Sequence, residues 1–260
     1  MRVDTDAVAA SLVRAQDERR PVDTVFGADA STAEEGFRVQ QQVVRIKESR
    51  GDKVVGFKLG NIAKAMQDKF GVDEPDYGYL LVSHFLPENL AVAQSDFIEP
   101  FIELEIGFVL KRDLSGPHIT AADVISATDY VLPALEIIDS RVKDWNIGLG
   151  DTLADSGSAG AVILGAQPRG LGEVDVSDMH GEIRFDGHTV AEGNSSAVYG
   201  SPVSAIAWLC RRISEYGVGL RAGDLVMPGS CLAAEKLRPG TTVLGEFHGW
   251  AAVQFDFTTS

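Results

Sequence analysis

Residues 101–108 read Phe101-Ile102-Glu103-Leu104-Glu105-Ile106-Gly107-Phe108. Alternation with a period of two is typical of a β-strand, because successive side chains of a strand point to opposite faces. The apolar side chains at the even-numbered positions therefore share one face, which we expect to lie in a core. Glu103 and Glu105 share the other face. Two carboxylates so close together repel each other unless a cation lies between them, and a divalent cation that prefers oxygen ligands is a candidate.

A third carboxylate, Glu136, interrupts the apolar stretch 131–138 (Val-Leu-Pro-Ala-Leu-Glu-Ile-Ile). An ionised carboxylate in such a place is costly unless it is paired or coordinated. Together with Glu103 and Glu105 it would form an oxygen site suited to Mg²⁺ or Mn²⁺, whereas zinc favours His and Cys ligands, which these strands lack. The alternative is a half-exposed strand whose glutamates simply face water. The pattern alone leaves both interpretations open.

The composition favours a folded, acidic chain. It has 260 residues, 45% of them hydrophobic, which is enough for one large domain or a domain with a small appendage. The formal net charge of −15 repels nucleic-acid backbones and anionic membrane surfaces, so we expect neither as a partner. An anionic substrate stays compatible with this charge if a bound cation reverses it locally.

Two cysteines, Cys210 and Cys231, have neither zinc-site spacing nor the number needed for a disulfide framework. We expect both to be reduced and buried, which favours the cytoplasm. The charged residues 1–6 lead into no apolar run, so we expect no signal peptide, and no stretch is long and apolar enough to span a membrane.

The chain divides into a helical region, residues 1–50, and a β-rich region, residues 51–260. Thr32 with Glu35 predicts a capping box, Thr120 predicts a second helix start, and Ser201-Pro202 predicts a third helix, which ends near Gly217. Asp186-Gly187 predicts a hairpin turn. The predicted strands are 53–60, 101–110, 134–139, 182–185, 189–192, 224–227, 241–247 and 251–257. Strands and helices do not alternate regularly, so we predict an α+β fold.

Three further segments carry chemistry-bearing residues. Lys58 lies in the apolar stretch 54–60, where a desolvated lysine loses its proton more readily; the alternative is an exposed lysine on an edge strand. Asp76 lies in Glu74–Gly78, a turn by composition, as a loop carboxylate or only a turn former. The small, polar stretch 151–160 could hold a carboxylate or enolate oxygen, or be a plain loop. The five histidines show no metal-site spacing.

In this order, the motifs resemble one family. It comprises the 2-keto-4-pentenoate hydratases and the 2-oxo-3-hexenedioate (4-oxalocrotonate) decarboxylases of the fumarylacetoacetate-hydrolase-like superfamily. The resembling segments are Gly56-Phe57-Lys58-Leu59-Gly60, Pro75-Asp76-Tyr77-Gly78, Glu103-Leu104-Glu105 and residues 134–141, Ala-Leu-Glu-Ile-Ile-Asp-Ser-Arg. Asp144-Trp145 followed by residues 151–155 is more similar to the hydratase branch. The resemblance covers about residues 32–257.

The resemblance implies a mixed β-roll or sandwich with a small N-terminal helical region, assembled into homo-oligomers. It implies Mg²⁺ or Mn²⁺ on Glu103, Glu105 and Glu136. It also implies that Lys58, Asp76 and Ser158 are pocket residues that handle protons and orient substrate or water. The chain departs from the family at Ser156-Gly157-Ser158-Ala159, where a second serine is missing, and at Gly229-Ser230-Cys231-Leu232, where a threonine is missing. These departures bear on substrate identity more than on reaction class.

The activity implied is hydration of a 2-hydroxy-2,4-dienoate to a 4-hydroxy-2-oxo acid, with Lys58 and Asp76 as the acid/base pair. Three alternatives remain: decarboxylation of 2-oxo-3-hexenedioate, hydrolysis of an acylpyruvate, and a non-catalytic partner subunit of a hydratase–decarboxylase complex. The expected partner is a small 2-oxo or 2-hydroxy dienoate acid. Association with a downstream aldolase or a decarboxylase subunit is a further expectation.

Overall fold

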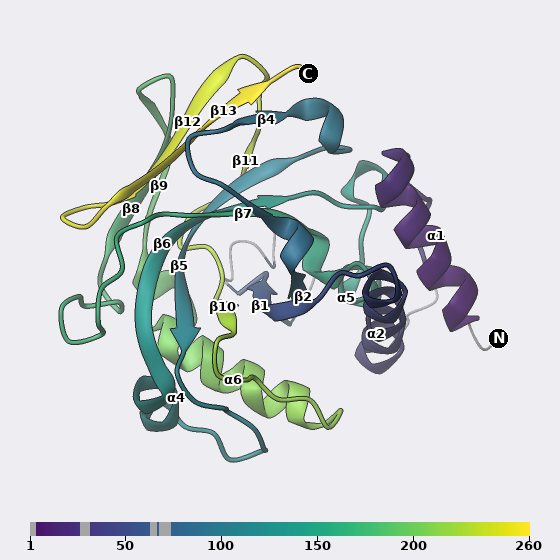
Figure 1. The fold of residues 1–260 in the computed structure, drawn as a ribbon, viewed down its shortest axis with the longest axis horizontal. Helices are drawn as coiled ribbons and strands as arrows, with labels where there is room; N and C mark the ends of the chain where they lie inside the picture. Colours follow the sequence, from purple (N-terminus) through teal and green to yellow (C-terminus); the bar gives the residue numbers. More distant parts are fainter. Residues whose placement is uncertain (1–3, 27–31, 63–66, 68–73) are drawn as a thin grey trace.

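The computed structural model describes residues 4–26, 32–62, 67 and 74–260. Among these residues the strands form two sheets, and helices flank them (Figure 1). The sheets are mixed, because β1–β10, β3–β7 and β13–β4 pair in parallel while the other neighbours are antiparallel. This arrangement confirms the predicted α+β class.

The larger sheet is built around the opening stretch of sequence. The strand that contains it, β5, pairs with β6 along nearly its whole length. The order across the sheet is β2 (Asp76–Leu81), β1 (Val54–Gly60), β10 (Leu225–Met227), β5 (Phe101–Leu110), β6 (Thr128–Ile138), β7 (Ala159–Leu164) and β3 (Phe85–Leu86), and β11 (Glu235–Lys236) also pairs with β5. The short strand β10 therefore joins the Lys58 strand to the Glu103 strand.

The second sheet packs against the face of β5 that carries the even-numbered residues. Its order is β4 (Ala91–Ala93), β13 (Ala252–Thr258), β12 (Thr241–Phe247), β8 (His180–Phe185) and β9 (His188–Asn194). A Cβ on Gly181 would lie 2.9 Å from Leu104, and a Cβ on Gly245 would lie 2.9 Å from the same side chain, so glycine lets the two sheets approach closely. The hairpin predicted at Asp186-Gly187 is confirmed, with both residues at positive φ.

The helices begin largely where the sequence predicts. They are α1 (Thr5–Glu18), α2 (Ala33–Ser49), α4 (Ala121–Ala127), α5 (Leu149–Ala154) and α6 (Pro202–Ser214), with 3-10 turns at Val82–His84, Gln94–Asp96, Lys143–Trp145, Ser156–Ser158 and Ser195–Ala197. The capping boxes at Thr32 and Thr120 are confirmed. Ser201 precedes the proline-led α6 as expected, although its hydroxyl makes no capping hydrogen bond. The composition of residues 21–30 predicts a turn region, of which residues 27–30 lie outside the described part of the chain.

Two predicted segments differ in the structure, and strands β3, β4, β7 and β11 were not predicted. Strand β6 begins at Thr128 rather than at residue 134 and runs through Pro133. The Pro133 carbonyl accepts a hydrogen bond from Gly165, which lies just beyond the end of β7. Proline has no N–H to donate, but at this position the regular pairing of β6 with β7 has already ended, so the strand loses no ladder hydrogen bond there. The second difference is Asp76: it begins strand β2 and is not in a turn.

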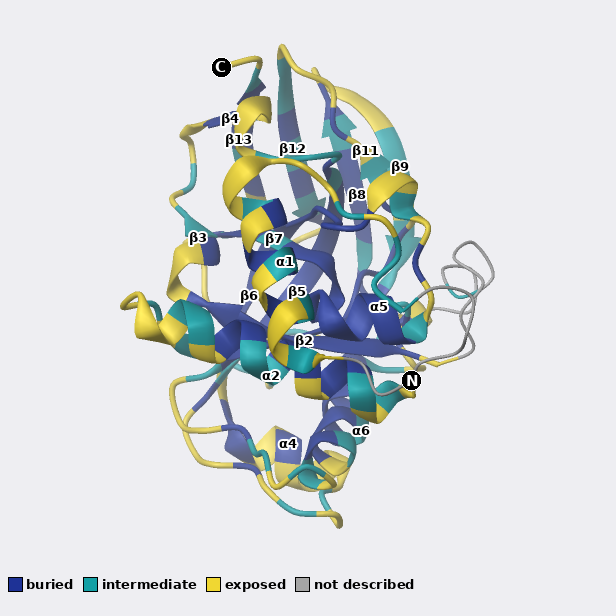
Figure 2. Cartoon of the chain, turned by 90° about the vertical axis from the view of Figure 1, so that its right-hand side faces the viewer, coloured by how far each residue is buried: buried dark blue, intermediate teal, exposed yellow. Residues whose placement is uncertain are grey.

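Helix α2 packs on the same face of the large sheet as the second sheet but toward the β2 edge, because the pairing registers place Tyr79 of β2 on the same face as Phe108 of β5. Phe37 of α2 contacts Tyr77 and Tyr79 of β2, with ring centroids 5.3 and 5.8 Å apart. In Figure 2 α1 and α2 show exposed outer faces, while the strands behind them are buried. Both cysteines are free and buried, as expected. Among the described residues, no helix is long and apolar enough to cross a membrane.

We expect Leu104→Ala to lower the free energy of unfolding by about 2–5 kcal/mol, because the fully buried side chain fills the space between the sheets. Urea unfolding measures this difference. Leu90, which is 52% exposed, supplies the matched control, since Leu90→Ala should change stability by at most about 0.5 kcal/mol. Equal losses in the two variants would contradict the packing described for Leu104.

Candidate metal centre

The pairing register of β5 and β6 brings three glutamates together. Glu103 lies directly opposite Glu136, and Glu105 follows two residues later on the same face. One carboxylate oxygen of each residue lies within 4.8 Å of the other two. All three side chains are buried, so the interpretation of Glu103 and Glu105 as a solvated strand face is wrong.

The three carboxylates carry more negative charge than their protein surroundings balance. Burial raises the pKa of Glu105 well above its ordinary value, and the neighbouring Glu136 and Glu103 raise it further. Burial also raises the pKa of Glu136, against the opposing effect of Lys58. Oε1 of Glu105 and both carboxylate oxygens of Glu136 receive no hydrogen bond. Buried oxygens of this kind normally have partners, so the donor set fits a divalent cation with a preference for oxygen.

A backbone N–H fixes the remaining oxygen of Glu105. Gly229 follows β10 and donates to Oε2 of Glu105 over 2.7 Å. Gly229 has a φ of 113°, and a Cβ there would lie 2.4 Å from Ile62, so glycine is required for this approach. Because Oε2 is held in this way, Oε1 is the oxygen of Glu105 left for a cation.

Lys58 lies inside the sheet beside the glutamates. Strand β1 has β2 on one side and β10 on the other, so the interpretation of Lys58 as an exposed edge residue is wrong. Its ammonium donates to the Gly157 carbonyl over 2.9 Å and lies 3.4 Å from Oε1 of Glu136. Burial lowers the pKa of Lys58, but Glu136 and other nearby carboxylates outweigh burial and raise it above its ordinary value. Lys58 is therefore held as an ammonium, contrary to the expectation that desolvation eases its deprotonation.

Asp76 faces Lys58 across Gly60. A Cβ on Gly60 would lie 2.3 Å from Oδ1 of Asp76 and 3.1 Å from Nζ of Lys58. Oδ2 of Asp76 accepts hydrogen bonds from Asn61 over 2.6 Å and from Thr152 over 2.8 Å. Oδ1 receives none. One oxygen thus anchors the carboxylate, and the other is left to accept a proton or a hydrogen bond.

Ser158 lies in a turn of unusual conformation. Ser156, Gly157 and Ser158 all have positive φ, at 54°, 62° and 56°. Each of the two serines pays roughly 1–2 kcal/mol for this left-handed conformation. The hydroxyl of Ser158 donates to Oδ2 of Asp155 over 3.1 Å. Its lone pairs therefore remain available as acceptors on the side of the site. The stretch 151–160 is accordingly helix α5, this turn and the start of β7, and not a plain loop.

A small cavity joins these residues. Lys58, Asp76, Glu103 and Ser158 line it together with Gly60, Asn61, Ile138, Trp145, Ile147, Thr152 and Gly157. Part of its wall is therefore apolar, beside a polar side that holds an ammonium and carboxylates. The structure thus brings all the residues singled out in the sequence into one place, with Glu105 and Glu136 behind Glu103.

Sequence reasoning missed the residues that support the site. Gln40 is fully buried, donates to the carbonyls of Tyr77 and Leu153 and accepts from the Tyr79 N–H, so it joins α2 to β2 and α5. A signal existed, because Gln40 follows Phe37 by three residues on the apolar face of the helix. Thr152 and Asn61, which hold Asp76, carry no comparable signal.

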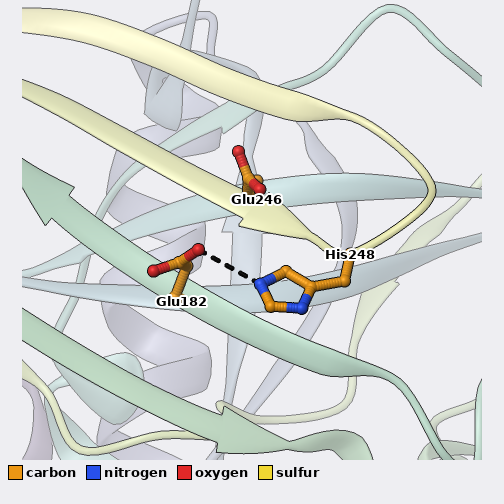
Figure 3. Close-up of side chains that lie close together, drawn as sticks. All are labelled: Glu182, Glu246 and His248. Carbon is orange, nitrogen blue, oxygen red and sulfur yellow. Dashed lines mark hydrogen bonds and ion pairs between the residues drawn. The ribbon is translucent and has the colours of Figure 1, made fainter. Parts of the chain in front are cut away.

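A second acidic group lies on the outer face of the second sheet. Glu182, Glu246 and His248 also place ligand atoms within 4.8 Å of one another, and His248 lies 3.1 Å from Glu182 (Figure 3). Sequence reasoning gave His248 no role. Here, however, Arg184 forms ion pairs with both glutamates, and hydrogen bonds from Thr189 and His248 hold the pKa of Glu182 at about 2. The negative charge of this group is already compensated, so the buried glutamates are the stronger candidate metal centre.

Comparisons with known proteins find related sequences and structures. A family model described as "Fumarylacetoacetate (FAA) hydrolase C-terminal" matches residues 60–257. The chain is 36% identical to a 2-keto-4-pentenoate hydratase of Burkholderia vietnamiensis (strain G4 / LMG 22486), over 97% of each chain. It is 36% identical to a 2-hydroxyhexa-2,4-dienoate hydratase of Comamonas testosteroni, over 76% of each. A solved structure of the 4-oxalocrotonate decarboxylase from Pseudomonas putida G7, complexed with magnesium and adipate, superposes with a TM-score of 0.94 at 32% identity, covering 99% of this chain and 98% of the other.

Gly78→Ala should destabilise the protein by about 1–3 kcal/mol, because a Cβ at Gly78 would lie 2.0 Å from the Ser156 carbonyl oxygen and push the left-handed turn away from β2. Thermal denaturation monitored by circular dichroism measures the effect. Gly172→Ala is the matched control, since no atom lies within 4 Å of the added methyl group. If both variants melt together with the unmodified protein, the close contact between β2 and the turn is refuted.

Proposed function

The chain belongs to the fumarylacetoacetate hydrolase family, and we propose that it is a divalent-metal-dependent hydratase acting on a 2-hydroxy-2,4-dienoate. The proposed reaction adds water to a substrate of the 2-hydroxypenta-2,4-dienoate type and gives a 4-hydroxy-2-oxo acid. The observation that carries the proposal is the group of three buried glutamates, in which Oε1 of Glu105 and both oxygens of Glu136 receive no hydrogen bond, next to the Lys58 ammonium and the Asp76 carboxylate.

In this proposal Glu103, Glu105 and Glu136 hold the cation, Mg²⁺ or Mn²⁺. Three observations support this choice: oxygens of Glu105 and Glu136 receive no hydrogen bond, the group contains no His or Cys, and magnesium is named in the decarboxylase structure. When bound, such an ion acts as a Lewis acid that stabilises negative charge developing on the oxygens of a 2-oxo acid.

Lys58 and Asp76 are the proposed acid/base pair. The ammonium of Lys58 is the proton donor, and Oδ1 of Asp76, which has no hydrogen-bond partner, is the acceptor. Ketonisation of the dienol delivers a proton to C5 and removes the proton of the C2 hydroxyl. Water then adds at C4, and C3 takes up a proton. Since both groups lie against Gly60, one bound substrate can reach both.

Ser158 orients the attacking water or the substrate carboxylate in this proposal. Its hydroxyl proton is directed to Asp155, so toward the cavity the oxygen acts as an acceptor. An acceptor suits a water molecule that must present its own oxygen to carbon. The apolar part of the wall, formed by Ile138, Trp145 and Ile147, suits the short hydrocarbon end of a dienoate.

Decarboxylation of 2-oxo-3-hexenedioate is the second candidate, because the decarboxylase structure matches 99% of this chain. A substrate with a second carboxylate calls for a second cationic group. Among the described residues that line the cavity, Lys58 is the one cation, and it already faces the glutamates. This favours hydration. Release of CO₂, measured beside the loss of dienoate absorbance, separates the two reactions. Homo-oligomerisation stays a prediction of the sequence.

Glu105→Gln should abolish metal-dependent turnover, a loss of about 100-fold or more, because the ion supplies several kcal/mol of stabilisation. Dienoate absorbance, followed after chelator treatment and again after addition of Mg²⁺ or Mn²⁺, measures this effect. In addition, Mg²⁺ should raise the melting temperature of the unmodified protein and of Glu246→Gln, but not of Glu105→Gln. Full activity of chelator-treated Glu105→Gln would overturn the assignment.

Lys58→Met should reduce kcat by about 100-fold to 10,000-fold through loss of the proton donor. The same variant should bind Mn²⁺ at least as tightly as the unmodified protein, because a positive charge 3.4 Å from Glu136 has been removed. Steady-state kinetics and calorimetric Mn²⁺ titration provide the two measurements. If Lys58→Met lost Mn²⁺ binding but kept its turnover per bound metal ion, Lys58 would support metal binding and would not be the proton donor.

A further inference from the structure

Arg141 lies behind the candidate site and does not line its cavity. It follows β6, and its side chain is buried together with that of Asp155. The guanidinium donates to the Asp155 carboxylate through Nε over 2.5 Å, and through Nη2 to the Asp155 carbonyl. Its Nη1 donates to the carbonyls of Asp139 over 2.8 Å and Ala159 over 2.7 Å. One side chain thus contacts the residue before the left-handed turn and the residue after it.

The turn needs such a support. Three successive residues in the left-handed region, two of them serines, form a conformation that the backbone does not favour on its own. A planar guanidinium with donors pointing in several directions can bridge both ends of a turn, whereas a lysine ammonium is a compact point charge. The contacts of Arg141 therefore oppose relaxation of the turn.

The left-handed turn presents two polar groups to the cavity. The Gly157 carbonyl accepts the hydrogen bond of Lys58, and Ser158 places its hydroxyl there. Asp155 connects Arg141 to Ser158, because its Oδ1 accepts a hydrogen bond from Arg141 while its Oδ2 accepts one from Ser158. A shift of Arg141 would thus displace both the Gly157 carbonyl and the Ser158 hydroxyl.

We propose that Arg141 is a positioning residue, which holds the turn 156–158 in the conformation that places the Lys58 ammonium and the Ser158 hydroxyl for proton handling. The inference rests on the proposed function for the identity of the reaction. A positioning role differs from a purely structural one. If the Arg141–Asp155 ion pair were only structural, its removal would lower stability without a selective effect on turnover.

Steady-state kinetics of Arg141→Lys and Arg141→Ala test the inference. We expect kcat to fall by about 100-fold, the size of effect that an ångström-scale misplacement produces, with KM and Mg²⁺ affinity within about threefold of the unmodified protein. Millimolar guanidinium should restore turnover of Arg141→Ala in a saturable manner. Arg184→Lys, in the ion pairs of the second sheet, is the matched control and should keep its kcat. A fall in melting temperature with unchanged kcat per folded molecule would overturn the inference, as would absence of guanidinium rescue.

Hydrogen exchange supplies a readout that needs no turnover. In Arg141→Lys, amide exchange should accelerate in residues 155–159 and stay unchanged in β8 and β12. Uniform acceleration, or none in 155–159, would refute the positioning role. If the unmodified protein hydrates no dienoate, the proposed function fails, and the exchange result then decides separately whether Arg141 holds the turn.

Discussion

The mutual repulsion of three buried carboxylates is the constraint on which this structure depends. The β5–β6 register places Glu103 opposite Glu136, and the strand period adds Glu105 on the same face. Burying such a group is unfavourable unless positive charge and hydrogen-bond donors compensate it. The protein supplies the Lys58 ammonium near Glu136 and the N–H of Gly229 to Glu105, and still leaves Oε1 of Glu105 and both oxygens of Glu136 without a hydrogen bond. The remaining imbalance is what a divalent cation would remove.

The two acidic groups of the protein show that composition alone does not define a metal centre. Glu182, Glu246 and His248 include a histidine, which transition metals favour, and their ligand atoms also lie within 4.8 Å of one another. Arg184 nevertheless compensates that group on the outer surface of the sheet. The buried group has one ammonium, shared with Gly157. The two groups therefore differ in how many of their carboxylate oxygens already have a hydrogen bond or an ion pair.

Local patterns in the sequence predicted local features well. Capping at Thr32 and Thr120 and the turn at Asp186-Gly187 depend on neighbouring residues, so they could be read directly. Alternation in β5 correctly predicted which residues share a face. It could not predict that both faces are covered, because the covering elements come from distant parts of the chain. The same limit hid the burial of Lys58 and the strand that begins at Asp76.

The supporting contacts could not be predicted, because they join segments that lie far apart in sequence. Gln40 binds α5, and Thr152 binds Asp76. Arg141 and Asp155 are closer in sequence, yet their hydrogen bonds accompany three successive left-handed residues, and two of these are serines, which do not favour that conformation. The resemblance to the hydratase family pointed to Lys58, Asp76 and Ser158, and the structure shows that these three residues line one cavity and which groups hold them.

The position of β10 has a consequence for the order in which the protein can assemble. Strand β10 comes late in the chain, yet it lies between β1, which carries Lys58, and β5, which carries two of the glutamates. Gly229, two residues after the end of β10, also fixes Glu105. During synthesis on the ribosome the glutamates and the lysine emerge early but stay on separate sheet fragments. A prematurely terminated chain would therefore carry all three glutamates but lack both the strand that joins them to Lys58 and the N–H of Gly229 that fixes Glu105.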